Sequence, residues 1–352
     1  MNYFLYPLGL LYGSILKVRR YFYQQKWLTS YSFPVSTIGV GNLRVGGTGK
    51  TPHIEFLIRE FANDYTLLAT LSRGYGRSSK GYLLASALTQ SQRTAKNLGD
   101  EPLQFFTKFP FIEVAVCEDR KAGIENILRD RPQVDMILLD DVFQHLSVQP
   151  DCQILLTEYA DPYYADFPLP AGRLREFASA ATAADIIIVT KTPKTITQEQ
   201  REEIIHAIKP NVNQQVFFST YIYEKPKPCN PLAEQVNLLP DTPIILLTGI
   251  AKSEALKREV ETHFHNVKHY PFPDHYTFPV KKIQAIIDEN KALLENGAVF
   301  FTTEKDTMRL ITNEIKKVVS LHPLFSLPIR VEILFNEKQS LIKNINSYVT
   351  KN

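Results

Sequence analysis

Apolar residues recur along the chain in short runs, and helical or loop patterns fill the segments between them. The runs span Val35–Val40, Thr66–Leu71, Ile112–Val116, Met136–Leu139, Gln153–Leu156 and Asp185–Val189. Most of these runs have the length of a buried strand, and polar residues follow them. Repeated strand–helix units of this kind predict an α/β fold, with a mostly parallel sheet and helices on both of its faces.

The pattern changes near residue 215. Two extended segments, Val216–Tyr223 and Ile329–Phe335, bracket a second strand–helix region that contains Ile244–Thr248, Ser253–His263 and Ala298–Thr302. We expect the bracketing strands to pair as a two-stranded ribbon that joins a larger domain to a smaller α/β domain. The predicted segments are an N-terminal helix (1–29), a core domain (30–214), the smaller domain with ribbon strands at both ends (215–337) and a C-terminal helix (338–352).

A glycine-rich loop follows the first of the apolar runs, and a helix-like segment, His53–Phe61, follows the loop. Glycines let backbone N–H groups approach phosphate oxygens, and a helix N-terminus adds partial positive charge. A strict P-loop has glycine where this chain has Arg44, but the remainder is intact, so we interpret the loop as a variant P-loop; a chance glycine turn is the alternative. The expected nucleotide-binding residues are Arg44, Val45, Gly46, Gly47, Thr48, Gly49, Lys50 and Thr51.

Polar residues collect where the predicted strands end, which is where ligands of parallel sheets bind. Asp140 ends the run Met136–Leu139, at the position where a P-loop NTPase places an acid that holds Mg²⁺. Thr51 is expected to take a second position on that ion, and Lys50 to reach the outer phosphates. A helix cap is the alternative role for Asp140.

Phosphoryl transfer to a hydroxyl also needs a group that orients or deprotonates the hydroxyl. The candidates for this role are Asp100, Glu101, Asp141, His145 and His275. His275 belongs to the second strand–helix region, so it reaches the phosphate loop only across an interdomain cleft. Arginine suits bidentate phosphate contact, and the candidates are Arg73, Arg77, Arg120, Arg173 and Arg175.

The first 29 residues differ from the rest of the chain. They hold no charge until Lys17 and are rich in apolar and aromatic residues, and no acidic residue precedes Glu55. The uncharged stretch is shorter than the ~20 residues that span a bilayer, and its basic residues follow the apolar part, unlike those of a signal peptide. We expect an amphipathic helix that lies on an anionic membrane surface. A core helix that packs its aromatic rings on the main domain is the alternative.

Composition narrows the class of protein less than the pattern does. The chain has 352 residues, of which 44% are hydrophobic and 22% charged, as is ordinary for a globular protein of two domains. The formal net charge of +3 is too small to indicate nucleic-acid binding. Three separated cysteines predict neither a zinc site nor a disulfide framework, and they favour a reducing, cytoplasmic setting. The sequence indicates no obligate protein partner.

Seven motifs occur in order along nearly the whole chain. They are Gly41-Asn42-Leu43, Gly46-Gly47-Thr48-Gly49-Lys50-Thr51-Pro52, Leu71-Ser72-Arg73-Gly74-Tyr75-Gly76, Gly99-Asp100-Glu101-Pro102, Asp140-Asp141-Val142-Phe143-Gln144-His145, Pro170-Ala171-Gly172-Arg173-Leu174-Arg175-Glu176 and Asp274-His275. Together they resemble the tetraacyldisaccharide 4'-kinase family of lipid A biosynthesis. One residue departs from the family's commonest form, because Val142 stands where glycine is usual.

The resemblance implies an ATP- and Mg²⁺-dependent enzyme that phosphorylates the 4'-hydroxyl of a tetraacylated glucosamine disaccharide 1-phosphate. It places the enzyme on the cytoplasmic face of the Gram-negative inner membrane, peripheral or monotopic, with the lipid and the anionic membrane surface as partners. It also implies that Asp100 and His275 act together as the base. Carried over in the same way are Lys50 as a catalytic residue, Thr51, Asp140 and Glu101 as Mg²⁺ ligands, and Arg120 as a phosphate clamp.

Two other functions compete with a lipid kinase. A P-loop kinase for a small metabolite leaves the first 29 residues unexplained. A non-catalytic nucleotide switch is disfavoured, because Thr190-Lys191-Thr192-Pro193 is a poor match to the guanine-binding motif of GTPases. Partner-moving ATPases, in turn, have lysine at the position of Val45.

Overall fold

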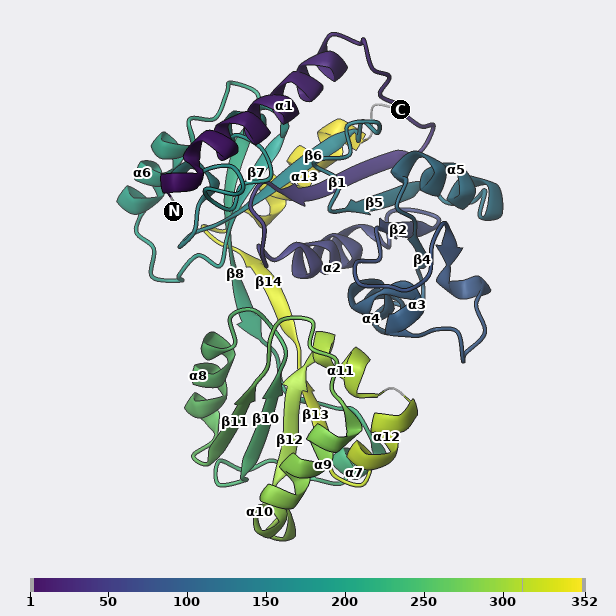
Figure 1. Ribbon diagram of the computed structural model, residues 1–352, viewed down its shortest axis with the longest axis vertical. Helices are drawn as coiled ribbons and strands as arrows, with labels where there is room; N and C mark the ends of the chain where they lie inside the picture. The colour runs from purple at the N-terminus through teal and green to yellow at the C-terminus, as the bar shows by residue number, and fades with distance from the viewer. Residues whose placement is uncertain (1–2, 312, 350–352) are drawn as a thin grey trace.

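The computed structural model describes residues 3–311 and 313–349, which form two sheets (Figure 1). The large sheet has, in spatial order, β14 (Ile329–Ile333), β8 (Gln215–Tyr223), β7 (Ile186–Thr190), β6 (Cys152–Glu158), β1 (Ser36–Asn42), β5 (Met136–Asp140), β2 (Leu68–Ser72), β4 (Glu113–Val116) and β3 (Leu83–Leu84). From β8 to β4 every neighbouring pair is parallel, and only the edge strands β14 and β3 pair antiparallel. The predicted α/β fold with a mostly parallel sheet is therefore confirmed.

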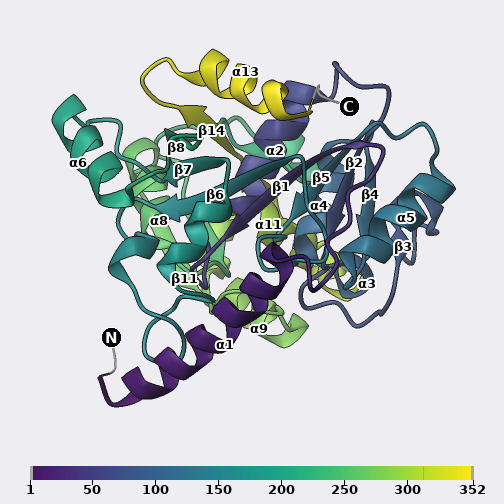
Figure 2. The ribbon, with the colours of Figure 1, turned by 90° about the horizontal axis from the view of Figure 1, so that it is seen from above.

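Helices cover both faces of the large sheet, because each carries one apolar stripe. On one face lie α2 (Lys50–Phe61), α4 (Asp100–Lys108) and α13 (Lys338–Val349). In α2 the stripe is Ile54, Leu57, Ile58 and Phe61, all buried, at helical spacing. The opposite face is covered by α5 (Arg120–Asp130) and α6 (Gln198–Ile208). Figure 2 shows α2 and α13 on one side of the sheet and α5 on the other. The remaining short helices here are α3 (Ala95–Leu98), η1 (Tyr3–Leu5), η2 (Ala85–Ala87), η3 (Tyr163–Ala165) and η4 (Ala178–Ala183).

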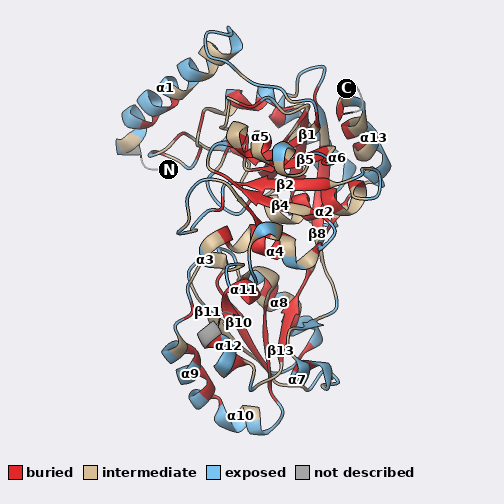
Figure 3. Ribbon diagram, turned by 90° about the vertical axis from the view of Figure 1, so that its right-hand side faces the viewer, coloured by how far each residue is buried: buried red, intermediate tan, exposed pale blue. Residues whose placement is uncertain are grey.

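The small domain has its own sheet and core. Its strands are, in spatial order, β11 (Val267–Pro271), β10 (Ile244–Thr248), β12 (Val299–Thr303), β13 (Leu324–Leu327) and β9 (Lys227–Pro228). One face packs α9 (Val280–Glu289), α10 (Lys291–Glu295) and α12 (Asn313–Val319), and the other packs α7 (Pro231–Glu234) and α8 (Glu254–His263). The helix α11 (Glu304–Leu310) follows β12 and lies against α4 of the large domain (Figure 3).

The ribbon between the domains is formed as predicted. β8 pairs in parallel with β7 through Gln215–Phe218, and its second half, Ser219–Tyr223, pairs antiparallel with Ile329–Ile333 of β14. The chain thus leaves the large domain and returns to it through adjacent strands (Figure 1). Both strands belong to the large sheet, and the domain boundaries proposed from the sequence stay a prediction.

The N-terminal helix α1 (Tyr6–Gln24) packs on the large domain through small residues. A Cβ on Gly9 would lie 2.9 Å from Pro168 O, and a Cβ on Gly13 would lie 2.7 Å from the ring of Phe177, so only glycine allows this close approach. Arg20, further along the same face, pairs with Glu176 at 2.8 Å. The other side of α1 keeps its large apolar side chains in solvent, as in Leu11 and Ile15, each 60% exposed.

Candidate active site

The glycine loop adopts the strand–loop–helix geometry predicted for a phosphate cradle. Gly46 and Gly49 have φ of 128° and 92°, conformations that other residues rarely adopt, and α2 begins at Lys50. A Cβ on Gly46 or Gly47 would meet no atom of the described residues within 4 Å, so the space above this part of the loop is open. Buried Asn42 holds the loop from below, because its Nδ2 donates to Arg44 O at 2.6 Å and to Thr48 Oγ1 at 2.9 Å.

The first two residues of the predicted nucleotide-binding set use their polar groups within the protein. The Arg44 guanidinium pairs with Asp166 at 2.7 Å and with Asp161 at 3.0 Å, and the Val45 N–H donates to Arg173 O at 2.8 Å. Arginine is tolerated in place of the usual glycine because its side chain is turned to these two carboxylates. Direct contact of Arg44 and Val45 with a nucleotide stays a prediction.

Lys50 lies between the loop and the segment that follows β5. Its Nζ is 3.4 Å from Asn42 Oδ1 and 3.7 Å from Asp141 Oδ1. Asp141 also accepts two hydrogen bonds from Arg175 Nη1, at 2.8 and 3.0 Å. Burial would raise the pKa of Asp141, but Lys50 and Arg175 outweigh burial and lower the pKa below its ordinary value. Asp141 is therefore ionised and already neutralised by two cations.

Asp140 has the opposite environment although it is the next residue in the chain. Burial raises the pKa of Asp140 to about 7, Glu101 adds repulsion, and Lys50 only partly opposes them. Its Oδ2 is 3.4 Å from Ser72 Oγ, while its buried Oδ1 has no hydrogen-bond partner among the described residues. A buried carboxylate oxygen without a partner, beside a second carboxylate, fits a site for a divalent cation.

Few protein side chains near Asp140 can coordinate a metal ion. This suits Mg²⁺ rather than an ion whose ligands all come from the protein. Thr51 lies in the first turn of α2, and Glu101 lies beside Asp140 at the start of α4. Within the described part of the chain, no group of three or more His, Cys, Asp or Glu side chains is arranged to hold a metal ion. Mg²⁺ commonly binds through one or two carboxylates, a hydroxyl and the phosphates of its nucleotide, so the residues present fit this ion.

Arg120 is buried directly behind Asp140. Its exposed fraction is 1%, and its Nη1 and Nη2 donate to Cys117 O at 2.6 Å and to Asp140 O at 2.9 Å. Burial lowers the pKa of this guanidinium from its ordinary value, against the attraction of the two aspartates. Arg120 therefore fixes the backbone at the end of β5 and places positive charge beside Asp140. A direct phosphate contact by Arg120 stays a prediction.

The turn after β5 explains why Val142 is accepted. The left-handed residue of the turn is Asp141, with φ of 52°, and Val142 itself is not in the positive-φ region. Its side chain is buried in a cluster with Val35 and Leu139. The turn therefore needs no glycine at position 142. Gln144 stays close to the loop, since its Nε2 donates to Asn42 O at 3.0 Å.

Asp100 and His275 meet across the two domains, although they are 175 positions apart. Asp100 begins α4 in the large domain, and His275 lies in the turn after β11 with φ of 57°. His275 Nδ1 is 3.1 Å from Asp100 Oδ2, and the His275 ring lies 5.4 Å from the ring of Tyr75. Because Glu101 is the neighbour of Asp100 and repels Asp140, this pair lies beside the predicted metal position.

Two basic residues that contact the Asp100–His275 pair were not among the candidates from the sequence. Lys305 Nζ is 3.0 Å from His275 Nε2, and Arg309 Nε is 3.1 Å from Asp100 Oδ2. Both residues lie on α11 of the small domain. Their spacing of four on a short helix after a buried strand was the available signal, but it does not tell which surface the helix meets.

The structure links the remaining candidates from the sequence to the site by fewer contacts. Arg77 Nη2 pairs with Glu118 Oε1 at 2.6 Å, whereas Arg73 and Arg173 are exposed. Burial and the charge of Arg120 lower the pKa of His145 to about 4, so its ring is neutral at pH 7.

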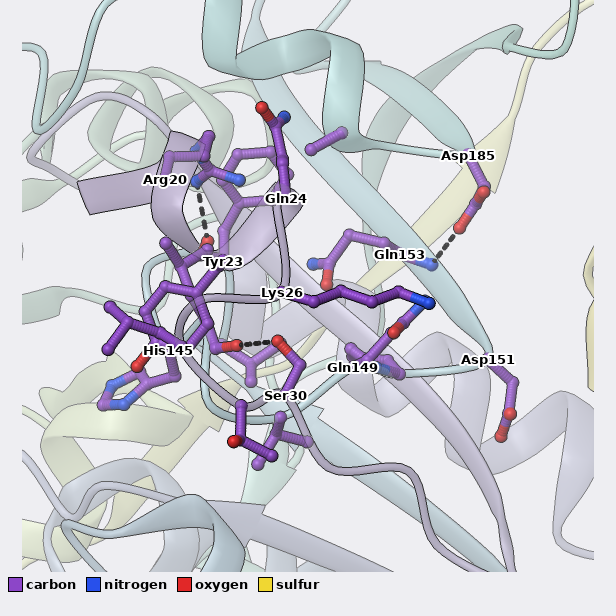
Figure 4. A pocket seen from close by; sticks show the side chains of 18 residues that line it. Arg20, Tyr23, Gln24, Lys26, Ser30, His145, Gln149, Asp151, Gln153 and Asp185 are labelled. Atoms are coloured by element: carbon purple, nitrogen blue, oxygen red, sulfur yellow. Dashed lines mark hydrogen bonds between the residues drawn. The ribbon is translucent and has the colours of Figure 1, made fainter. Parts of the chain in front are cut away.

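His145 also lines a cavity of 740 Å³ on the side of the sheet next to α1 (Figure 4). Arg20, Lys26, Asp151 and Asp185 line it as well. Asp151 and Asp185 directly precede β6 and β7, so the cavity extends away from the phosphate edge, which lies at the opposite ends of the strands.

The geometry of the site agrees with the comparison of this chain with known proteins. The profile of the family described as Tetraacyldisaccharide-1-P 4'-kinase matches residues 1–350. The Tetraacyldisaccharide 4'-kinase of Bacteroides thetaiotaomicron is 39% identical over 99% of this chain and 93% of its own length. That of Flavobacterium johnsoniae is 41% identical over 99% of this chain and 97% of its own length.

A solved structure extends the similarity to the whole fold. The crystal structure of "apo" form LpxK from Aquifex aeolicus in complex with ATP has a TM-score of 0.72 and 26% identity, and the match covers 98% of both chains. The motifs, the arrangement of the site and the full-length match agree, and we conclude that this chain belongs to the tetraacyldisaccharide-1-P 4'-kinase family.

Proposed function

We propose that the protein transfers the γ-phosphate of ATP to the 4'-hydroxyl of a tetraacylated glucosamine disaccharide 1-phosphate. The observation that carries this proposal is the Asp100–His275 pair, formed across the domains next to Glu101, whose charge raises the pKa of Asp140. A phosphate cradle alone supports any P-loop protein. A carboxylate–imidazole pair at its edge supplies what transfer to a hydroxyl needs in addition.

Each residue has a defined part in the proposed reaction. Asp100 takes the proton of the 4'-hydroxyl while that oxygen bonds to the γ-phosphorus and the bond to the β,γ-bridging oxygen breaks, releasing ADP. His275 donates Nδ1–H to Asp100 Oδ2 and orients the carboxylate. Lys50 contacts the outer phosphate oxygens and stabilises their charge as the bond to ADP breaks. Mg²⁺ supplies further positive charge when it is bound, and Thr51, Asp140 and Glu101 are the residues that would hold it.

The test measures transfer of labelled phosphate from Mg-ATP to purified tetraacyl disaccharide 1-phosphate in detergent micelles, and it compares the wild type with two variants. Asp100→Ala is expected to lower kcat by a factor of about 10² to 10⁴, the contribution typical of a general base. Asp241→Ala is the control, because this small-domain carboxylate is 91% exposed. If the wild type hydrolyses ATP without transfer to the lipid, a metabolite kinase or a nucleotide switch replaces the proposal.

We further propose that the outer face of α1 rests on the cytoplasmic face of an anionic inner membrane. The residues that support this are apolar and exposed, such as Leu8, Leu11, Ile15 and Val18. The alternative of a core helix has less support: Tyr6 stacks on Phe167 of the main domain, but Tyr6, Tyr12 and Tyr21 are 39%, 38% and 49% exposed. Within residues 3–311 and 313–349, no helix is long and apolar enough to cross a membrane. An exposed apolar face of this kind suits an enzyme with a lipid acceptor, because withdrawing acyl chains from the membrane costs ~0.8 kcal/mol per CH₂.

Sedimentation with anionic phosphatidylglycerol vesicles tests the membrane contact. The double variant Leu11→Glu, Ile15→Glu places two charges on the exposed face and is expected to weaken vesicle binding at least tenfold. Val212→Glu and Leu321→Glu are matched controls, since these side chains are 97% and 70% exposed but lie on other surfaces. Equal sedimentation of the double variant and the wild type would contradict the proposed contact.

A further inference from the structure

The helix α11 meets α4 with two rows of side chains. Residues 304 and 308 form one row, in which Glu304 pairs with Lys108 at 2.5 Å and the sulfur of Met308 lies 3.9 Å from Thr107 Oγ1. Residues 305 and 309 form the next row and face the opposite end of α4, where Asp100 and Glu101 lie. The first row therefore attaches α11 to the large domain, and the second directs two cations at the proposed base.

Arg309 organises the small-domain side of this contact. Its Nη1 donates to Tyr276 O at 2.9 Å, and its Nη2 lies 3.0 Å from Asp306 Oδ1. Asp306 is fully buried and accepts from the Gly249 N–H at 2.9 Å, while His275 N donates to Gly249 O at 3.2 Å. Arg309 thus holds the loop that carries His275, so its removal disturbs the fold of that loop as well as the site.

Lys305 is different because it acts on the imidazole itself. An ammonium group only donates hydrogen bonds, so His275 Nε2 must accept with its lone pair. The single proton of the neutral ring then lies on Nδ1, which faces Asp100. Asp100 then accepts a hydrogen bond from this N–H through its Oδ2. Both His275 and Arg309 contact Oδ2 of Asp100.

Charged and titratable groups from both domains face the His275 ring or its partners. Lys305 also lies 3.5 Å from Glu101 and 3.6 Å from Asp274, and its side chain is 18% exposed. Asp100 faces Nδ1 from α4, Arg309 faces Asp100 from α11, and Tyr75 packs near the ring. Lys305 is the cation that faces Nε2, and two carboxylates hold it there.

We propose that Lys305 is a positioning residue that fixes the Nδ1–H tautomer of His275 and so holds the Asp100 carboxylate in the orientation of a base. This inference rests on the proposed roles of Asp100 and His275. In the reaction Lys305 transfers no proton and contacts neither ATP nor the acceptor hydroxyl. It keeps the His275 proton on the nitrogen that serves Asp100.

The test measures the tautomer and the kinetics of the full-length protein in detergent. Lys305→Met removes the donor at similar length, Lys305→Arg keeps one, and Lys291→Met is the control because Lys291 is 78% exposed on α10. Two-dimensional ¹⁵N–¹H spectra of the imidazole, assigned with His275→Gln, report which nitrogen carries the proton. We expect Nδ1–H in the wild type, a mixture with Nε2–H in Lys305→Met, and recovery in Lys305→Arg.

The kinetics should follow the tautomer. Lys305→Met is expected to lower kcat at least tenfold, with the KM values for ATP and lipid changed less than twofold. Lys305→Arg should regain most of kcat. An unchanged tautomer in Lys305→Met, or a raised KM at unchanged kcat, overturns the inference and makes Lys305 a substrate contact. The spectra need no lipid transfer, so failure of the proposed kinase activity is seen separately from failure of this inference.

Discussion

The two sides of the candidate site are built in different ways. On the phosphate edge, Lys50 begins the helix after the glycine loop, Asp140 ends β5, and Asp141 follows it directly. On the opposite side, Asp100 of the large domain meets His275 and Arg309 of the small domain, and Lys305 contacts His275. The phosphate edge is therefore complete within one domain, whereas the proposed base is complete only when two domains are correctly placed.

This difference separates nucleotide binding from transfer. Damage to the phosphate edge should weaken binding of Mg-ATP, because the charges and backbone groups of this edge all belong to one domain. Damage to the contact between α11 and α4 should leave ATP affinity unchanged and lower kcat or stability.

The largest effect on the interdomain side is expected for Lys108→Met. Lys108 Nζ lies 2.7 Å from Glu55 and 2.5 Å from Glu304, so its loss leaves the buried Glu55 and the partly buried Glu304 without their shared cation. We expect the free energy of unfolding to fall by about 3 kcal/mol, as for a broken buried pair, while ATP affinity is kept. Chemical denaturation and calorimetric titration with ATP measure the two quantities.

The pH dependence of that variant follows from Glu304. Burial raises the pKa of Glu304 from its ordinary 4.5, Glu55 adds to the rise, and Lys108 opposes it. A carboxyl group with a raised pKa destabilises the fold once it ionises, so the deficit of Lys108→Met should grow as the pH rises above about 4.5. Arg59→Met is the control, because Arg59 pairs with the same Glu55 but does not contact Glu304. Equal losses in both variants would place the effect within the large domain.

A smaller effect is expected on the phosphate edge, in the pH dependence of Mg²⁺ binding by Asp140. Because the pKa of Asp140 is raised to about 7, its carboxyl group is increasingly protonated below that pH and must ionise to bind Mg²⁺. The apparent Mg²⁺ affinity should fall about tenfold for each pH unit below 7, measured by titration of the ATP-bound protein. Asp140→Asn should lose both the affinity and its pH dependence, and Asp100→Asn should keep both. A Mg²⁺ affinity that is flat between pH 5 and 7 would contradict this role of Asp140.

The smallest effect is expected for Lys252→Met, at the second place where the domains meet. Lys252 pairs with Glu158 at 2.8 Å and Asp161 at 2.6 Å, but its side chain is 55% exposed. Exposed ion pairs contribute less than about 1 kcal/mol and are screened by salt. Unfolding of the variant and the wild type should therefore differ little, and less at high salt. A loss as large as that of Lys108→Met would show that both contacts hold the domains together.

The parts of the molecule that were predicted from the sequence are those set by nearby residues. Each apolar run expected as a strand lies within two residues of an observed strand, because a strand buried on both faces needs a continuous apolar segment. β11 was missed, since this edge strand carries polar residues such as Lys268 and His269 and none of its residues is fully buried. The glycine loop was recognised because its conformation requires glycine at fixed positions.

The base side depends on distances in space that no local pattern contains. The Asp100–His275 pair was expected only from the family resemblance, and its contact is now observed. Lys305 and Arg309 were not predicted, because the surface that α11 meets depends on how the ribbon places the small domain. Val142 shows the same limit at short range, since the left-handed residue of its turn is Asp141.

The ribbon of β8 and β14 also determines when each part of the chain can finish folding on the ribosome. Residues between Tyr223 and Ile329 are contiguous and contain the whole small sheet, so they can assemble while the rest of the chain is still being translated. The large domain must wait, because α13 packs on β1 and β6, and Ser36 Oγ donates to Val349 O at the other end of the chain. β1 is therefore covered by a helix whose Val349 follows Ser36 by 313 positions, so this apolar face of the strand stays uncovered until α13 has been synthesised.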